Sequence, residues 1–314
     1  MFLNVLRNNE FASYALCILI ALGFSFFVFN AEIQANPFCF SDLNLIFFES
    51  DILIKSLFYL VWTLSGILAN RILMKYKLVD FKGGLFLFFY VMFSVAFWKT
   101  NISLDLMLSL LFLILSIQQL FSIHQTTGKI SQSLNLGLYL GLSIYFYYPV
   151  FVFLIWLIIS LAKVKPFKFR DLILVLIGVC IPFYLYVVYH FLNDTLYWWI
   201  FEILTQFSFP NQFLKYFQNN YLWLFTCVLL MISLVSTIRK MDKMTVKIRM
   251  FYNILLWMTF FSVVILFFGR SILIESIFIF LPLCYFASHY FFTLKRKWLF
   301  DLGVLFYLFL LFYK

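Results

Sequence analysis

The chain has 314 residues, of which 65% are hydrophobic and 11% are charged, and its formal net charge is +10. This apolar share exceeds that of soluble globular domains, so lipid must solvate much of the molecule. The positive charge is therefore interpreted as loop charge that faces anionic lipid headgroups, and no nucleic-acid partner is implied.

Eleven apolar stretches are candidate membrane spans, although several are shorter than the roughly 20 residues that a helix needs to cross the hydrocarbon core. They lie near residues 11–30, 52–70, 84–98, 103–122, 133–148, 149–162, 171–192, 221–238, 250–268, 272–294 and 299–313. The runs are continuous rather than alternating, which favours helices over barrel strands. The sequence therefore predicts one all-α domain over residues 1–314, a polytopic transmembrane bundle of about eleven spans that begins with an uncleaved helix.

The basic residues indicate an orientation. All 23 Lys and Arg residues fall in the odd-ranked segments between spans, counted from the N-terminus, except Lys55, Lys99, Lys215, Arg270 and Lys314. Because Lys and Arg are retained on the cytoplasmic side of a membrane, we expect the N-terminus in the cytoplasm and the C-terminus outside. The expected location is the inner (cytoplasmic) membrane of a bacterium.

Two pairs of spans are joined by very short segments. Residues 99–102 join the third span to the fourth, and residues 145–149 join the fifth to the sixth. Each pair is expected to form a tight helical hairpin. Because these spans are short, re-entrant segments are the alternative.

The first expected outer loop, residues 31–51, carries four carboxylates and no basic residue. Asp42, Glu49 and Asp51 are candidate catalytic residues, acting as a general base or a metal ligand at the outer leaflet. Alternatively, Ser50 or Asp51 caps the second helix, since acids are favoured in the first turn.

A helical pattern occurs in the expected outer segment 194–220. Apolar residues recur at helical spacing, with polar residues opposite them: Leu196, Trp199, Ile200, Ile203, Leu204 and Phe207 against Thr195, Glu202 and Gln206. The pattern predicts an amphipathic helix on the outer membrane interface. Trp198 and Trp199 are candidates to stack on a sugar or an acyl chain, with Glu202 facing the solvent or the site; an ordinary aromatic belt is the alternative.

Arg270 and Glu275 bracket a very short outer turn. A cation that stays on the outer side against the general trend is a candidate anchor for a lipid phosphate. Alternatively, Arg270 pairs with Glu275. The three histidines and five cysteines lack the spacing of a metal site, and no phosphate-binding glycine loop occurs. Neither a metal nor a cofactor is therefore assigned.

The run Glu49-Ser50-Asp51 resembles, in type and placement, the acidic first outer loop of the C-type polyprenyl-phosphate-sugar-dependent glycosyltransferases. These enzymes are also multi-spanning helical proteins. The resemblance implies glycosyl transfer from a polyprenyl phosphate at the periplasmic face, with a catalytic role for Asp42, Glu49 or Asp51.

A second resemblance covers more of the chain. Residues 77–84 and 137–194, including the runs 147–149, 165–171 and 178–183, are similar to a family of uncharacterised Bacteroidota polytopic inner-membrane proteins. This resemblance implies the membrane-embedded fold and no particular activity.

These features predict a membrane protein that handles a lipid-linked envelope substrate at the periplasmic face; its partners would be membrane lipids, polyprenyl phosphate among them. The alternative is a non-catalytic scaffold subunit of an envelope secretion or assembly complex, with other membrane subunits as partners. Gly137 and Gly141 form a Gly-x-x-x-Gly pair, which favours close helix packing within the bundle or against such a partner. No charged residue falls at the middle of a span, which argues against an ion-coupled transporter.

Overall fold

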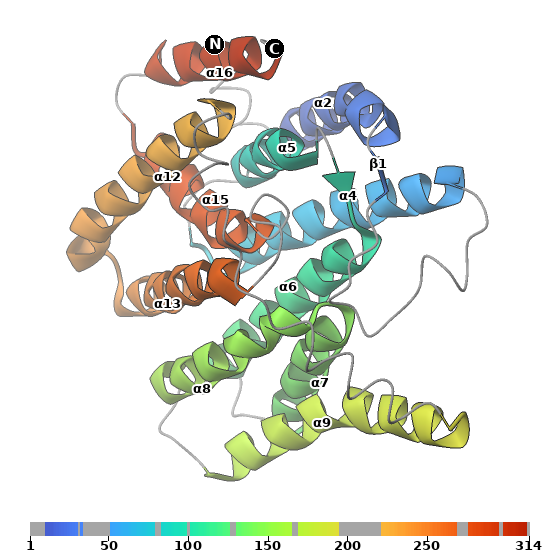
Figure 1. The fold of residues 1–314 in the computed structure, drawn as a ribbon. Helices are drawn as coiled ribbons and strands as arrows, with labels where there is room; N and C mark the ends of the chain where they lie inside the picture. The colour runs from blue at the N-terminus through green and yellow to red at the C-terminus, as the bar shows by residue number, and fades with distance from the viewer. Residues whose placement is uncertain are drawn as a thin grey trace.

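The computed structural model describes residues 10–30, 32–33, 51–78, 83–98, 101–125, 130–164, 169–194, 221–268, 276–294 and 298–312. These residues form α-helices, two short 3-10 helices and one pair of two-residue strands (Figure 1). The helices are α2 (Glu10–Asn30), α4 (Asp51–Lys75), α5 (Leu85–Trp98), α6 (Leu104–Gln125), α7 (Ile130–Phe146), η1 (Tyr148–Val152), α8 (Phe153–Val164), α9 (Phe169–Leu192), α12 (Tyr221–Lys240), η2 (Met241–Lys243), α13 (Val246–Phe268), α15 (Ile277–Phe292) and α16 (Trp298–Phe312).

Each of the eleven predicted apolar stretches coincides with one of these α-helices. Four segments are long and apolar enough to cross a membrane by length and composition: Ile52–Lys75, Leu104–Ile123, Phe169–Leu192 and Val246–Leu266. The chain is therefore a helical membrane protein, as predicted. Hydroxyl groups inside the helices donate to carbonyls about one turn earlier, as Ser65 does to Trp62 (2.7 Å) and Ser262 to Met258 (2.7 Å), so these donors are satisfied in an apolar environment.

Contacts between helices show that α4 is antiparallel to α2 and α5. The backbone N–H of Gly84, just before α5, donates to Ser13 Oγ near the start of α2 (2.9 Å). The side-chain amide of Asn70, near the end of α4, donates to the Tyr14 hydroxyl (2.7 Å). The starts of α2 and α5 and the end of α4 therefore lie at one end of the bundle.

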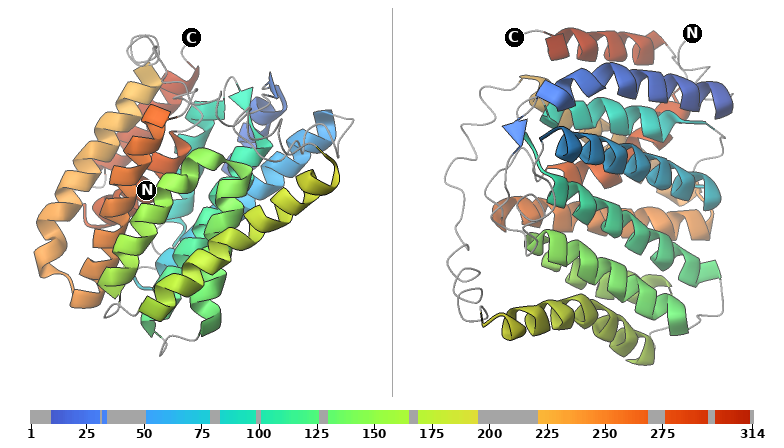
Figure 2. Two further views of the ribbon diagram at one scale, coloured as in Figure 1. Left: turned by 60° about the horizontal axis from the view of Figure 1, so that its bottom comes forward. Right: turned by 90° about the vertical axis from the view of Figure 1, so that its right-hand side faces the viewer.

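The later helices continue this alternation. Ser109 near the start of α6 and Ser143 near the end of α7 bond reciprocally, each hydroxyl donating to the other's carbonyl (2.8 and 2.7 Å). Lys240 Nζ, at the end of α12, donates to Thr293 Oγ1 just after α15 (2.7 Å), so these two helices end together. Figure 2 shows the helices side by side along one common direction, with α16 and α9 at opposite edges of the bundle.

Basic side chains gather at one end of this bundle, which is termed the basic end. It is formed by the ends of α4, α6, α8, α12 and α15 and by the starts of α2, α5, α7, α9, α13 and α16. It carries Arg71, Lys75, Lys77, Lys163, Arg170, Arg239, Lys240, Lys243, Lys247 and Arg249, whereas Lys55 lies near the start of α4 at the opposite end. The described helix ends that adjoin the segments predicted to be cytoplasmic thus share one end.

Two tyrosines just inside the basic end join the helices there. The Tyr76 hydroxyl donates to the Gln118 carbonyl of α6 (3.1 Å), and the Tyr252 hydroxyl of α13 donates to the Leu78 carbonyl (3.1 Å). Burial raises the pKa of Tyr76 to about 12, so its hydroxyl remains a donor at neutral pH.

A short strand pair lies at the opposite end. Strand β1 (Glu32–Ile33), after α2, pairs in parallel with β2 (Asn101–Ile102), between α5 and α6, with Glu32 opposite Asn101. Because α2 and α5 both end here, the first two segments that the sequence predicts to be outer meet at this end.

Helices α5 and α15 form the centre of the bundle. All residues of α5 from Leu85 to Ser94 are buried, and nearly all of α15 from Ile277 to Ser288. Helix α15 packs against α5, α12 and α13, and the hydroxyl of its Tyr285 donates to the Ala69 carbonyl of α4 (2.9 Å). Aromatic rings fill the space between these helices, and Phe86 of α5 lies 4.4 Å from the Tyr285 ring, centroid to centroid.

The Gly-x-x-x-Gly pair packs within the bundle rather than against another protein. A Cβ atom at Gly137 would lie 2.1 Å from the Val175 carbonyl oxygen of α9, and one at Gly141 would lie 2.7 Å from the Val179 carbonyl oxygen. From the other side, a Cβ atom at Gly178 would lie 2.4 Å from the Leu134 carbonyl oxygen. Glycine at these positions lets the parallel helices α7 and α9 approach backbone to backbone.

The helices that the two short connections join have their main partners elsewhere. Helix α5 packs chiefly against α15, α2 and α4, whereas α6 packs against α7 and α4. The 3-10 helix η1, with Pro149 in its first turn, leads from α7 into α8, which packs against α13 and α6. The predicted helical hairpins are therefore wrong as packed pairs, because neighbours along the chain are separated by other helices.

Candidate functional site

Most of the site residues that the sequence predicts lie outside the described residues. These are Asp42, Glu49, Arg270, Glu275, Trp198, Trp199 and Glu202, together with the interfacial helix predicted over residues 195–209. Asp51 is the first residue of α4, at the end opposite the basic end. The partial positive charge of a helix N-terminus favours a carboxylate at this position, which suits a helix cap and a catalytic acid equally.

A second acid at this end, Asp105, lies in the first turn of α6 and is 2% exposed. The serines on either side of it, Ser103 and Ser109, are also buried. Ser109 bonds to Ser143, and the N–H of Tyr147 still bonds to the Ser143 carbonyl in helical register (3.1 Å). Because α6 and α7 are antiparallel, Asp105 in the first turn of α6 and Tyr147 just after α7 lie at the same end of this helix pair. These five residues are termed the polar cluster.

The polar cluster is enclosed by aromatic and aliphatic packing. The Tyr147 ring is 1% exposed and stacks on Phe278 in the first turn of α15 (5.7 Å between centroids, 17° between planes). The Phe278 carbonyl accepts a hydrogen bond from Ser262 of α13 (3.1 Å). Four helices, α6, α7, α13 and α15, therefore meet at the cluster.

The chemistry available at the polar cluster is that of a carboxyl group and hydroxyl groups. A carboxyl group can accept a proton from a hydroxyl group or hold that group by a hydrogen bond. Burying a carboxylate costs free energy unless it is hydrogen-bonded, and the helix N-terminus at Asp105 offsets part of this cost. The sequence signal for the cluster is weak: Asp105 and Ser109 are polar residues four apart in an otherwise apolar run.

The histidines with described side chains lie at opposite ends of the bundle. The His289 ring, near the end of α15, packs against Tyr252 (5.4 Å), and the His190 ring, near the end of α9, packs against Tyr186 (4.4 Å). Within the described part of the chain, no three His, Cys, Asp or Glu side chains are close enough together to hold a metal ion.

Comparisons of this chain with family models, with curated proteins and with solved structures gave no match. Its function is therefore argued from its own residues and their arrangement.

Proposed function

We propose that the protein is a polytopic protein of the bacterial cytoplasmic membrane, with about eleven membrane helices, its N-terminus in the cytoplasm and its C-terminus outside. The gathering of basic side chains at one end supports this orientation, because such residues are retained in the cytoplasm. The basic end then faces the cytoplasm, and the end with Asp51, Asp105 and the strand pair faces the periplasm.

Cysteine labelling tests this orientation. Single cysteines are introduced into a Cys39→Ser background at Lys77 and Lys243, which are exposed at the basic end, and at Asn193, which is exposed at the opposite end. With a membrane-impermeant maleimide on spheroplasts, we expect Asn193→Cys to react at once. Lys77→Cys and Lys243→Cys should react only after the membrane is opened. Reaction of the two lysine positions in sealed spheroplasts would contradict the orientation.

We further propose that the protein handles a lipid-linked envelope substrate at its periplasmic end, by glycosyl transfer from a polyprenyl phosphate. The buried Asp105 in the polar cluster carries this proposal, because it lies at the same end as Asp51 and the β1–β2 pair. In this reaction the bond between the sugar and the phosphate oxygen breaks, a bond to the acceptor oxygen forms, and the polyprenyl phosphate leaves.

The residues have separate roles in this mechanism. One acid among Asp42, Glu49 and Asp51 accepts the proton of the acceptor hydroxyl or holds a divalent cation. Arg270 holds the lipid phosphate, and Asp105 is a positioning residue that orients the acceptor side of the site. The aromatic and polar residues that the sequence assigns to substrate binding complete the donor site: Glu275, Trp198, Trp199 and Glu202.

Conservative variants test the reaction. We expect at least one of Asp42→Asn, Glu49→Gln and Asp51→Asn to lower sugar transfer from a lipid-linked donor in membrane vesicles by about a hundredfold or more, because a positioned acid or base contributes such factors. Asp105→Asn, at a positioning residue, should lower it less. Asp242→Asn, at an exposed acid of the basic end, is the matched control and should keep full activity. The mechanism is wrong if Glu49→Gln, Asp51→Asn, Asp105→Asn and Arg270→Ala all keep normal turnover at normal protein levels.

The alternative function is that of a non-catalytic scaffold subunit in an envelope secretion or assembly complex. Helix α9 supports it, because it lies at the edge of the bundle and exposes large side chains such as Tyr184 (68%) and Leu185 (63%). Purification in a mild detergent distinguishes the two functions. A monomer that turns over lipid-linked sugar supports the enzyme, whereas partners in stoichiometric amounts support the scaffold.

A further inference from the structure

A row of polar side chains runs along the outer face of α13, beginning at the basic end. Arg249, Asn253 and Trp257 are exposed and follow one another at intervals of four residues, so they lie on one face of the helix. They extend over about 12 Å by the rise of a helix and are termed the polar stripe. Further along this face the exposed side chains are apolar: Phe260 is 58% and Val263 is 44% exposed. The polar stripe therefore extends the basic end onto the surface that faces the membrane.

A lysine from the neighbouring helix reaches this stripe. The ammonium group of Lys163, one residue before the end of α8, lies 5.0 Å from the centroid of the Trp257 ring. The two helices are antiparallel, and the bond from Trp156 to the Ile254 carbonyl (3.0 Å) fixes their register. The end of α8 is thus close to the start of α13, whereas Trp257 follows that start by about 16 Å. Lysines near helix ends usually extend toward water, but the Lys163 side chain points away from the basic end.

Lys163 and the polar stripe present N–H donors that other described residues do not use. Within the described part of the chain, no carboxylate forms an ion pair with Lys163 or Arg249. In the same part of the chain, no acceptor bonds to the Asn253 amide or to the Trp257 indole. Charged and amide groups next to lipid tails cost free energy unless they have a partner. A lipid phosphate is such a partner, because it accepts bonds from ammonium, guanidinium, amide and indole groups alike.

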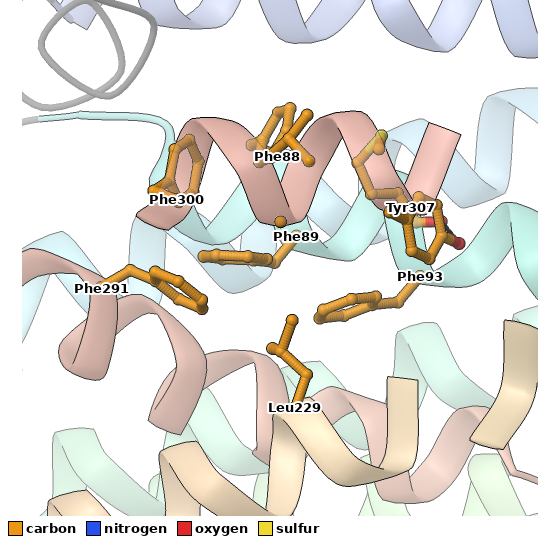
Figure 3. Close-up of a pocket in the computed structure, with 10 residues that line it drawn as sticks. Phe88, Phe89, Phe93, Leu229, Phe291, Phe300 and Tyr307 are labelled. Atoms are coloured by element: carbon orange, nitrogen blue, oxygen red, sulfur yellow. Dashed lines mark hydrogen bonds between the residues drawn. The ribbon is translucent and has the colours of Figure 1, made fainter. Parts of the chain in front are cut away.

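A lipid would reach these donors from outside the bundle. Inside it, the aromatic packing between α5, α12, α15 and α16 leaves a cavity of about 20 Å³ (Figure 3), room for about one water molecule. The outer faces of α13 and α8 are exposed, with Ile155 of α8 at 51%. We propose that an anionic phospholipid from the leaflet at the basic end binds here, with its phosphate at Lys163 and the polar stripe and an acyl chain along Phe260 and Val263. The two positive charges favour an anionic headgroup. This site lies at the end opposite the polar cluster and does not depend on glycosyl transfer.

Native mass spectrometry tests the headgroup contact. The purified full-length protein is titrated with phosphatidylglycerol or with phosphatidylcholine of the same acyl chains, and phosphatidylglycerol should bind at least about fivefold more tightly. We expect Lys163→Gln to weaken phosphatidylglycerol binding about fivefold, the effect of one basic residue near an anionic lipid. The matched control is Lys240→Gln, because Lys240 Nζ already donates to Thr293 Oγ1 (2.7 Å) at the same end; it should bind normally. Equal binding of the two lipids, an equal effect of the two variants, or a second protein chain in place of bound lipid would overturn the proposal.

A second variant distinguishes a headgroup site from a surface that only contacts lipid tails. Asn253→Leu replaces an exposed amide by an apolar side chain, which would leave contacts with lipid tails unchanged or improve them. If Asn253 bonds the phosphate, we expect phosphatidylglycerol to bind about fivefold more weakly, the effect of one hydrogen bond. Val263→Leu, on the apolar part of the same face, is the control and should bind normally. Unchanged or tighter binding by Asn253→Leu would overturn the proposal. Both positions are exposed, so neither change disturbs the packing of the bundle.

Discussion

Leucine at Gly178 is expected to separate α9 from α7 and to lower the free energy of unfolding by more than about 3 kcal/mol. A Cβ atom at this position would lie 2.4 Å from the Leu134 carbonyl oxygen and 2.8 Å from the Leu138 backbone nitrogen. Overpacking against side chains usually costs roughly 1–3 kcal/mol. Here the obstacle is the backbone of a neighbouring helix, which cannot rotate away as a side chain can, so the cost should exceed that range.

Unfolding in a mild detergent measures this effect. Gly137→Leu should be as damaging as Gly178→Leu, because it acts on the same contact from the other helix, where a Cβ atom would lie 2.1 Å from the Val175 carbonyl oxygen. Gly23→Leu is the control and should unfold like the unmodified protein, since its surroundings are open. If the two α7–α9 variants also unfold normally, the helices do not touch in the folded protein.

Alanine at Trp156 is expected to lower the free energy of unfolding by roughly 3–5 kcal/mol, the usual cost of deleting a large buried side chain. Trp156 is fully buried, its indole N–H donates to the Ile254 carbonyl of α13 (3.0 Å), and its ring meets Phe153 edge-on (5.8 Å between centroids). The cost arises from lost packing contacts around the cavity. The Trp156 side chain joins α8 to α13, the main packing partner of α8. These two helices should therefore separate first in the Trp156→Ala variant.

Two further variants separate the contributions at Trp156. Trp156→Phe keeps most of the ring and removes the hydrogen bond, which is worth about 0.6 kcal/mol on average between membrane helices. Trp298→Ala, at a residue that is 58% exposed at the start of α16, should cost less than about 1 kcal/mol. Equal midpoints of unfolding for Trp156→Ala and Trp298→Ala would contradict the central position of Trp156.

The helices themselves could be predicted from hydropathy, because lipid requires long apolar runs with satisfied backbones. The expected span 221–238, for example, is α12 (Tyr221–Lys240). The observed helix ends differ from the expected span ends where charged residues belong to the helix. Helix α13 begins at Val246, before the expected residue 250, because Lys247 and Arg249 form its first turn outside the apolar run.

The neighbours of each helix could not be predicted, because membrane helices are apolar on the faces toward lipid and toward protein alike. Leu305 is 68% exposed and Leu281 is fully buried, yet both belong to apolar runs of similar composition. The glycine spacing was the one pattern that indicated a contact between helices. The spacing of Gly137 and Gly141 indicated a close contact, and the structure identified the partner as α9 through Gly178.

The candidate site shows the same limit. Asp51 and Asp105 each begin a helix on the side that the sequence predicts to be outer. Only the antiparallel packing of α6 on α7, with Ser109 opposite Ser143, buries Asp105 at the same end as Tyr147. This packing depends on residues far apart in the chain, and no local pattern encodes it.

The central position of α15 has a consequence for biogenesis. This helix begins at residue 277, so the ribosome synthesises it after nine of the eleven described α-helices. Until then the Ala69 carbonyl that accepts the Tyr285 hydroxyl has no such donor, and the faces of α5, α12 and α13 that cover α15 remain unfilled. Early helices can enter the membrane one by one, but the bundle can close around its centre only after α15 has followed them.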